Sequence, residues 1–183
     1  MLQTPKPPSP TARFVGALAR LESEDRGSDR ATMAALRAGL RTPNGVATEM
    51  MPFVAPFLPE REFPSDERFF QIAALWALHP QNSFSGSFAS AFRELADGNS
   101  DSTEKRFQML LACEGDQLFR QLQQCVSLLA SKNIPVNWRK LLEDLVFHDW
   151  DDPNRELQLR WAREFYRKPA VPTDNDQSNS TQS

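Results

Sequence analysis

The most constraining feature of this chain is a short segment, residues 65–80, that is apolar on nearly every side. Ser65 can cap the start of a helix, and the two acidic residues that follow it favour the positive end of the helix dipole. The rest of the segment is almost wholly apolar, until Pro80 prevents the helix from continuing beyond His79. A helix without a polar face has to be covered on all sides, so we predict that it lies at the centre of the domain.

Helical spacing of apolar residues predicts further helices before and after this segment. No alternating strand pattern of useful length appears, and Leu plus Ala far outnumber Val plus Ile. The predicted helix starts are Ser9-Pro10, Ser28 or Asp29 for a helix through Leu40, the capping-box pair Asp101 and Glu104, Asn137, and Asp152-Pro153. We therefore predict an all-α fold, a helical bundle of about eight or nine helices in two packed halves.

The two ends of the chain differ in composition from the part between them. The first ten residues carry four prolines, and residues 168–183 are rich in Asn, Gln, Ser and Thr. Neither end has apolar material to bury. We predict a disordered N-terminal tail over 1–9, an N-terminal helical half over 10–98, a C-terminal helical half over 99–168 and a disordered C-terminal tail over 169–183.

No catalytic or metal-binding constellation stands out in the sequence. Cys113 and Cys125 have no metal-ligand spacing, and Cys125 falls on an apolar stripe where a buried thiol is the usual outcome. His79 is interpreted as a cap at a helix end, and His148 as a packing residue in a loop. Asp149 does not form a catalytic pair with His148, because adjacent residues on a helix point apart. We expect no enzymatic activity, no catalytic residue, no metal and no cofactor.

The sequence also bears on where the protein is found. No apolar run approaches the ~20 residues of a membrane span, and the proline-rich start lacks the apolar core of a signal peptide. Two cysteines form no disulfide framework. We expect a cytoplasmic protein without a membrane partner.

The basic residues are the most suggestive polar feature of the chain. The net charge of −3 does not indicate a nucleic-acid-binding protein, but a local basic face decides whether phosphates bind. Arginines recur along the second predicted helix, and Lys105 and Arg106 stand in the first turn of a later one, where a cation opposes the dipole. From spacing alone a solvated polar face is the favoured interpretation, and a backbone-binding groove assembled from both halves is the alternative.

Several short segments occur in a characteristic order: AALRAGL at 34–40, WALHP at 76–80, STEKRF at 102–107, VNW at 136–138 and WAREFY at 161–166. In this order and spacing, across about 12–167, the chain resembles the CasB family, the small subunit of the type I-E CRISPR surveillance complex Cascade. The chain departs from the family pattern at Ala38, where a second arginine is usual, and at Asn137, where aspartate is common.

The resemblance implies a non-catalytic subunit that binds nucleic-acid backbone and stabilises the R-loop, both target and displaced DNA strands, during antiviral defence. An R-loop exchanges one duplex for another of similar stability, so modest backbone contacts can favour it. The implied partners are the backbone subunit CasC, the large subunit CasA, CasD and CasE, a second copy of the same chain, the CRISPR RNA and the target DNA.

The same resemblance assigns Arg37, Lys105 and Arg106 as phosphate contacts by motif position. Proximity and charge add a further set of candidate nucleic-acid-binding residues: Arg30, Arg41, Arg120, Arg139 and Lys140. The alternative function is an all-helical protein–protein adaptor without direct nucleic-acid contact, whose arginines are ordinary surface residues.

Overall fold

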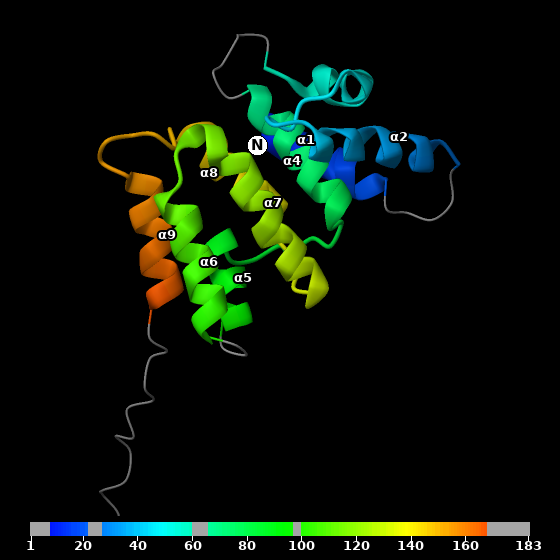
Figure 1. Cartoon of the computed structure of the whole chain (residues 1–183). Coiled ribbons are helices and arrows are strands. Elements are labelled where there is room, and N and C mark those ends of the chain that lie inside the picture. Colours follow the sequence, from blue (N-terminus) through cyan, green and yellow to red (C-terminus); the bar gives the residue numbers. More distant parts are fainter. Residues whose placement is uncertain (1–7, 22–26, 60–65, 97–99, 168–183) are drawn as a thin grey trace, which may run out of the picture.

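The computed structural model describes residues 8–21, 27–59, 66–96 and 100–167, which fold into two groups of helices that share one core (Figure 1). Over these residues there are nine α-helices and no strand beyond a single bridge between Asn82 and Val136, so the all-α prediction is confirmed. The α-helices are α1 (Pro10–Arg20), α2 (Gly27–Ala38), α3 (Met51–Val54), α4 (Asp66–Leu78), α5 (Phe88–Ala96), α6 (Ser100–Ala112), α7 (Gly115–Ser131), α8 (Trp138–Phe147) and α9 (Glu156–Tyr166). Three short 3₁₀ turns join them: η1 (Gly39–Arg41), η2 (Thr48–Met50) and η3 (Ala55–Phe57).

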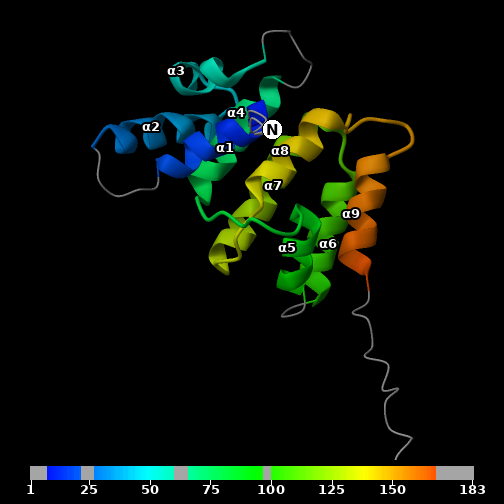
Figure 2. The ribbon, with the colours of Figure 1, turned by 180° about the vertical axis from the view of Figure 1, so that it is seen from behind.

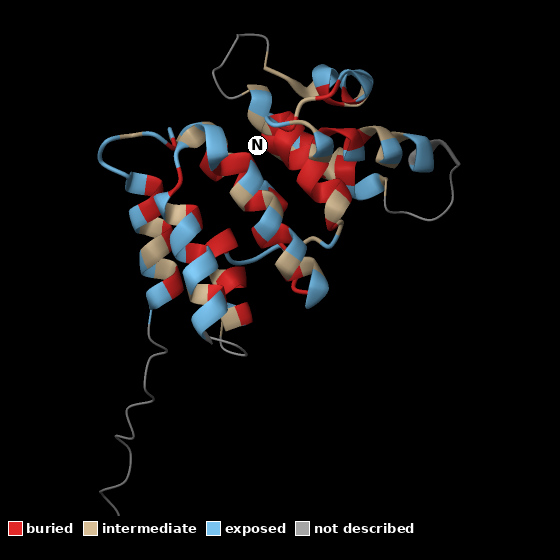
Figure 3. Cartoon of the chain, in the orientation of Figure 1, coloured by how far each residue is buried: buried red, intermediate tan, exposed pale blue. Residues whose placement is uncertain are grey.

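Helix α4 lies at the centre, as the sequence predicts. Every residue from Phe69 to Ala77 is buried, and Figure 3 shows these turns in red. Helices α2, α7 and α8 pack around it. The one polar residue in this stretch, Gln71, donates through Nε2 to the Asn44 carbonyl oxygen and to Glu67 Oε1, both at 3.0 Å. The buried amide is therefore satisfied.

Helices α5, α6 and α9 form a second group, held by aromatic rings. The Phe107 and Phe165 rings stack with centroids 4.2 Å apart, and the Phe88 ring lies 5.5 Å from that of Trp161. Helix α7 contacts α4 on one side and α5 and α6 on the other. The apolar core therefore continues from one group into the other. The predicted boundary between residues 98 and 99 lies outside the described residues, as do the two predicted tails except for Pro8 and Ser9.

Two predicted helix caps are confirmed. Ser9 Oγ accepts a hydrogen bond from the Ala12 N–H at 3.2 Å, and Asn137 Oδ1 accepts one from the Lys140 N–H at 3.0 Å. Both satisfy amides that have no partner inside the helix. The predicted cap Ser65 lies outside the described residues.

Other predicted helix starts are wrong. Helix α6 begins at Ser100, so Asp101 lies inside the helix and not at its cap, and the Glu104 carboxylate accepts from Gln108 and from the Tyr166 hydroxyl on α9. Helix α9 begins at Glu156, because Asp152 forms a tight turn in which its Oδ1 accepts from the Asn154 N–H at 3.1 Å.

The predicted bounds of the second helix also need correction. Helix α2 already begins at Gly27, ahead of Ser28 and Asp29, and it gives way to a 3₁₀ turn before Leu40. The turn brings Gly39 so close to Gly45 that a Cβ on Gly39 would lie 2.5 Å from the Gly45 carbonyl oxygen. This close approach permits only glycine.

The link between α4 and α5 is tied to the segment before α8. The buried His79 ring places Nε2 2.8 Å from the Ile134 carbonyl oxygen, so His79 joins these two segments of the chain. Further along, the Val136 carbonyl oxygen accepts from the Ser83 N–H at 2.9 Å. The Gln81 carbonyl oxygen accepts from the indole N–H of Trp138 at 3.1 Å.

A buried carboxylate joins α8 to α9. Asp144 is 1 % exposed, and its Oδ1 accepts from Lys140 Nζ and from Arg160, both at 2.6 Å. Its Oδ2 accepts from the indole N–H of Trp161 at 3.0 Å. His148 lies beside this cluster, with Nδ1 3.1 Å from the Asp144 carbonyl oxygen. None of the described helices is both long and apolar enough to cross a membrane.

Candidate nucleic-acid interface

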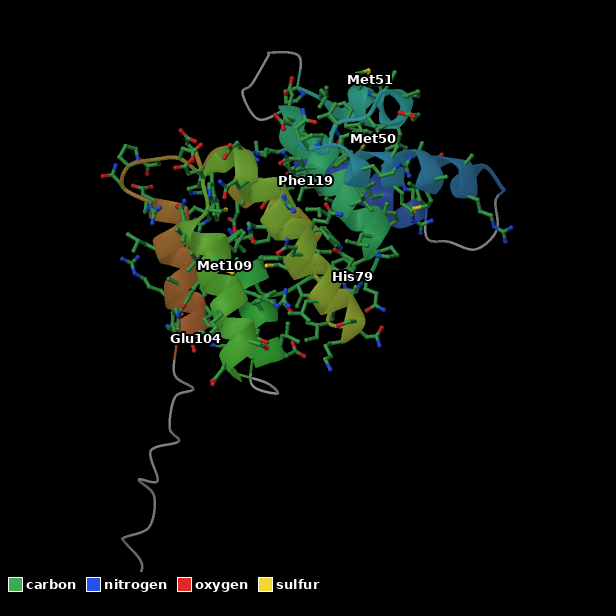
Figure 4. The ribbon with its side chains drawn as sticks, viewed as in Figure 1. Met50, Met51, His79, Glu104, Met109 and Phe119 are labelled. Carbon is green, nitrogen blue, oxygen red and sulfur yellow. The ribbon has the colours of Figure 1, made fainter. Side chains whose placement is uncertain are left out.

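A basic hollow lies on the outer face of α6 and α7, which run side by side (Figure 1). It has a volume of about 380 Å³ and is lined by Arg106, Arg120, Gln123, Gln124 and Ser127. Figure 4 labels Met109 on α6, three residues after Arg106, and Phe119 on α7, the residue before Arg120. Both arginines are exposed. We call this site the α6–α7 hollow.

Four of the five residues that line the hollow lie in a stretch of chain without negative charge. Residues 117–142 contain no Asp or Glu, and they carry Arg120, Lys132, Arg139 and Lys140. Arg106 leans from α6 towards α7, close enough for its charge to act on the Cys125 thiol. Burial raises the pKa of that thiol to about 12, and Arg106 opposes the rise. The local field is therefore positive although the whole chain is mildly acidic.

Lys105 and Arg106 are both exposed on α6, immediately before the buried Phe107. Only Arg106 lines the α6–α7 hollow. Because two adjacent residues of a helix point about 100° apart, Lys105 extends the positive surface beside the hollow instead of deepening it.

Of the N-terminal candidates, a hydrogen-bond contact brings Arg41 towards the hollow, whereas Arg37 and Arg30 lie along α2. Gln123 Nε2 donates to the Leu40 carbonyl oxygen at 3.4 Å, next to the exposed Arg41 in η1. Arg37 Nε donates to the Ala77 carbonyl oxygen at 3.1 Å, near the end of α4, where a cation is favourable to the dipole. Arg37 is therefore anchored at one nitrogen while its side chain remains exposed. Arg30 lies two turns earlier on α2 and is also exposed.

Arg139 and Lys140 lie elsewhere. Arg139 Nε pairs with Glu143 Oε1 at 2.9 Å, and Lys140 pairs with Asp144. Both residues line a second hollow, between α1 and α8. The eight candidate residues therefore fall on at least two surfaces. Gln123, Gln124 and Ser127 are the lining residues that the sequence interpretation missed, and the acid-free run over 117–142 is the signal that points to them.

Metal-ligating groups and thiols were the other candidates for chemistry in the sequence. Among them no group of three His, Cys, Asp or Glu side chains could hold a metal ion. Burial raises the pKa of Cys113 to about 11 and that of Cys125 to about 12, so both thiols are protonated at neutral pH and poor nucleophiles.

Comparison with known proteins identifies the same family by two routes. Residues 32–166 match the family model of the CRISPR-associated protein Cse2. The CRISPR-associated protein Cse2 of Thermus thermophilus is 37% identical over 161 residues, covering 86% of this chain and 90% of that protein.

Solved structures of CasB proteins have the same fold as this chain. The crystal structure of CasB from Thermus thermophilus superposes with a TM-score of 0.74 at 35% identity, over 87% of this chain and 99% of that one. CasB of M. ruber gives a TM-score of 0.67 at 30% identity, over 87% and 93% of the two chains. A chain of a CRISPR RNA-guided surveillance complex shares the fold, with a TM-score of 0.70 at 23% identity over 86% and 92%.

Proposed function

The chain belongs to the CRISPR-associated Cse2 family, and from this premise we propose that it is the non-catalytic small subunit of a type I-E Cascade complex. Its role is to hold nucleic-acid backbone and so to stabilise the R-loop during antiviral defence. The proposed partners are the other Cascade subunits (CasA, CasC, CasD and CasE), a second copy of the chain, the CRISPR RNA and the target DNA. The occurrence of the same fold in a CRISPR RNA-guided surveillance complex supports this assignment.

The α6–α7 hollow is the observation that carries the nucleic-acid part of the proposal. Arg106 and Arg120 present two planar guanidinium groups from two helices, and guanidinium suits bidentate contact with phosphate oxygens. The other lining side chains are amides and a hydroxyl, which donate neutral hydrogen bonds to the same oxygens. Such contacts position a strand without reading its sequence, as an RNA-guided complex requires.

Modest binding energy is sufficient for this task. The heteroduplex formed in an R-loop is about as stable as the duplex it replaces, so the equilibrium is sensitive to a few backbone contacts. Each neutralised phosphate also releases counterions, which makes the contribution fall as salt rises.

The test is the lifetime of the R-loop in reconstituted complex at two salt concentrations. We expect the double variant Arg106→Gln, Arg120→Gln to shorten the lifetime at low salt and to make it less sensitive to salt, about equally for different target sequences. A second variant, Arg37→Gln with Lys105→Gln, tests the neighbouring residues in the same way.

The matched control is Arg163→Gln, which removes one exposed arginine from α9. It should leave the lifetime unchanged. If the double variant enters the complex normally and the R-loop lifetime does not change at either salt concentration, the α6–α7 hollow is a solvated face. If the variants instead lower incorporation into the complex, the adaptor function is favoured.

A further inference from the structure

Phe84 is the most exposed large apolar residue among the described residues, with 95 % of its surface in contact with solvent. It lies in the link between α4 and α5, which crosses the molecule in Figure 2. A lone exposed phenylalanine is ordinary on a protein surface. Phe84 differs because hydrogen bonds fix the backbone on both sides of it and because it is one of the residues that line a hollow.

The turn that carries Phe84 is fixed on both sides of the ring. The Ser83 N–H donates to the Val136 carbonyl oxygen at 2.9 Å, and Ser83 Oγ accepts from the Ser85 N–H at 3.3 Å. After the ring, the Gly86 carbonyl oxygen accepts from Asn137 Nδ2 at 3.1 Å. Gly86 has a φ of 75°, a conformation that favours glycine. The ring is therefore presented to solvent from an ordered backbone.

The hollow beside Phe84 lies between α1 and α8, which are neighbours in Figure 2. Its volume is about 620 Å³, within the range of small-ligand sites. Small residues of α1, from Ala12 to Ala19, form one wall, and the first turns of α8 form the other. The floor is thus mostly apolar and the α8 wall is charged. We call this site the Phe84 hollow.

Positive charges outnumber negative ones around the Phe84 hollow. Helix α1 has no acidic residue and exposes Arg13. On α8, Arg139 pairs with Glu143, and Lys140 shares the buried Asp144 with Arg160, so one carboxylate there faces two cations. The Arg139 side chain stays 57 % exposed and that of Lys140 39 % exposed, and both stand at the helix start, where they add to the positive end of the dipole.

We propose that Phe84 stacks against one unpaired base of a single-stranded nucleic acid whose phosphates lie against Arg139 and Lys140. This inference deepens the proposed function, and rests on it for the class of ligand. An aromatic ring next to a positively charged groove is the usual means of binding single strands without sequence preference. An apolar protein segment in the same hollow would cover the exposed parts of Arg139 and Lys140 without offering them a hydrogen-bond acceptor, which is costly.

The test uses the isolated chain and two labelled strands of equal length, an oligo(dT) and the corresponding abasic strand. The abasic strand keeps the phosphates but has nothing to stack. We expect Phe84→Ala to weaken binding of oligo(dT) at low salt about tenfold, because a stacked base contributes ~1–3 kcal/mol. Binding of the abasic strand should not change. Phe84→Trp should keep the affinity of the original chain for oligo(dT).

Phe147→Ala is the matched control, since Phe147 is the other strongly exposed phenylalanine, 71 % exposed at the end of α8. It should bind both strands like the original chain. All variants should keep the helical circular dichroism of the original chain, because the substituted rings are exposed.

The outcomes separate this inference from the proposed function. The double variant Arg106→Gln, Arg120→Gln should weaken binding of the two strands equally, whatever the effect of Phe84→Ala. The stacking role is overturned if Phe84→Ala weakens binding of the two strands alike, or weakens binding of neither strand. It is also overturned if Phe84→Ala leaves oligo(dT) binding unchanged but lowers incorporation into the complex, which would identify Phe84 as a contact for a protein partner.

Discussion

At Asp144 a single buried carboxylate is shared by three donors on two helices. Asp144→Asn would leave the charges of Lys140 and Arg160 without their partner and would replace one acceptor by a donor. Breaking a buried ion pair costs about 3–5 kcal/mol, and both cations here are about one-third exposed, so water recovers part of the loss. We expect a loss of about 2–4 kcal/mol in the free energy of unfolding, measured by urea denaturation.

Glu143→Gln provides the comparison on the same helix. The Glu143 carboxylate is 26 % exposed, and its partner Arg139 is 57 % exposed. Exposed pairs contribute little, so this variant should lose under about 1 kcal/mol. Equal losses for the two variants would mean that Asp144 contributes no more than a surface ion pair.

The two cysteines should be unreactive in the folded protein. Burial raises the pKa of Cys113 to about 11 and that of Cys125 to about 12, above the ordinary thiol value of 9.0. The thiolate is the reactive form, so iodoacetamide should label both residues slowly at pH 8 and quickly after denaturation. Rapid labelling of the native chain, followed by mass spectrometry, would contradict this burial.

The same raised pKa values set a pH dependence of stability. Well below pH 9 the thiols are protonated in folded and unfolded chains alike, and they do not make the free energy of unfolding depend on pH. Above it the unfolded chain loses these protons first, so the free energy of unfolding should fall as the pH rises from about 9 towards 11. Replacing both cysteines by alanine should remove this part of the fall in the free energy of unfolding at alkaline pH.

At the scale of elements, α7 combines a buried stripe with the α6–α7 hollow. Leu122 is fully buried, between helices that include α4 and α6. Leu122→Ala should cost about 2–5 kcal/mol in the free energy of unfolding, because the cavity is enclosed by a packed core. Leu159→Ala on α9, where the side chain is 50 % exposed, is the matched control and should cost well under about 1 kcal/mol. A similar loss for both would show that the α7 stripe is not core.

The sequence predicted those elements whose signal is local. Helix α4 has apolar residues on every side, and the caps at Ser9 and Asn137 need only the next few amides. The start predicted at Asp101 lies one residue inside α6, and Glu104, its predicted capping-box partner, also binds Tyr166 on α9, far along the chain. The helix start predicted at Asp152 is wrong because an aspartate before a proline begins a turn as readily as a helix.

The candidate site was less accessible to prediction than the fold. Arg106 and Arg120 meet only because α6 packs on α7, which no spacing along either helix reveals. Arg139 and Lys140 carry the same charge but lie on α8, beside a different hollow. Charge type is visible in a sequence, whereas the grouping of charges on one face depends on tertiary packing.

At the scale of the whole molecule, the two helical groups should unfold together. One apolar cluster runs through both, and α4 and α7 contribute to it from either side of the predicted boundary. A shared core favours a single cooperative transition. Urea curves from circular dichroism and from tryptophan fluorescence should coincide, both in the original chain and in the double variant Trp76→Phe, Trp138→Phe.

The double variant Trp76→Phe, Trp138→Phe makes the measurement specific. Trp76 on α4 and Trp138 on α8 both lie in the group around α4, whereas the Trp150 ring packs on Trp161 of α9. In the double variant, fluorescence therefore reports the group of α5, α6 and α9, while circular dichroism reports both groups. Two separated transitions would show that the two groups are independent folding units.

The shared core also has a mechanical consequence. A close-packed interior is barely compressible, so a displacement imposed at one surface is passed to the others. The α6–α7 hollow and the Phe84 hollow are built on the same core, on α6 and α7 and on α1 and α8. The domain should therefore behave as a rigid body. If the proposed function holds and each hollow binds a strand, the two strands would be kept apart by the thickness of the domain and would not re-pair while both are bound.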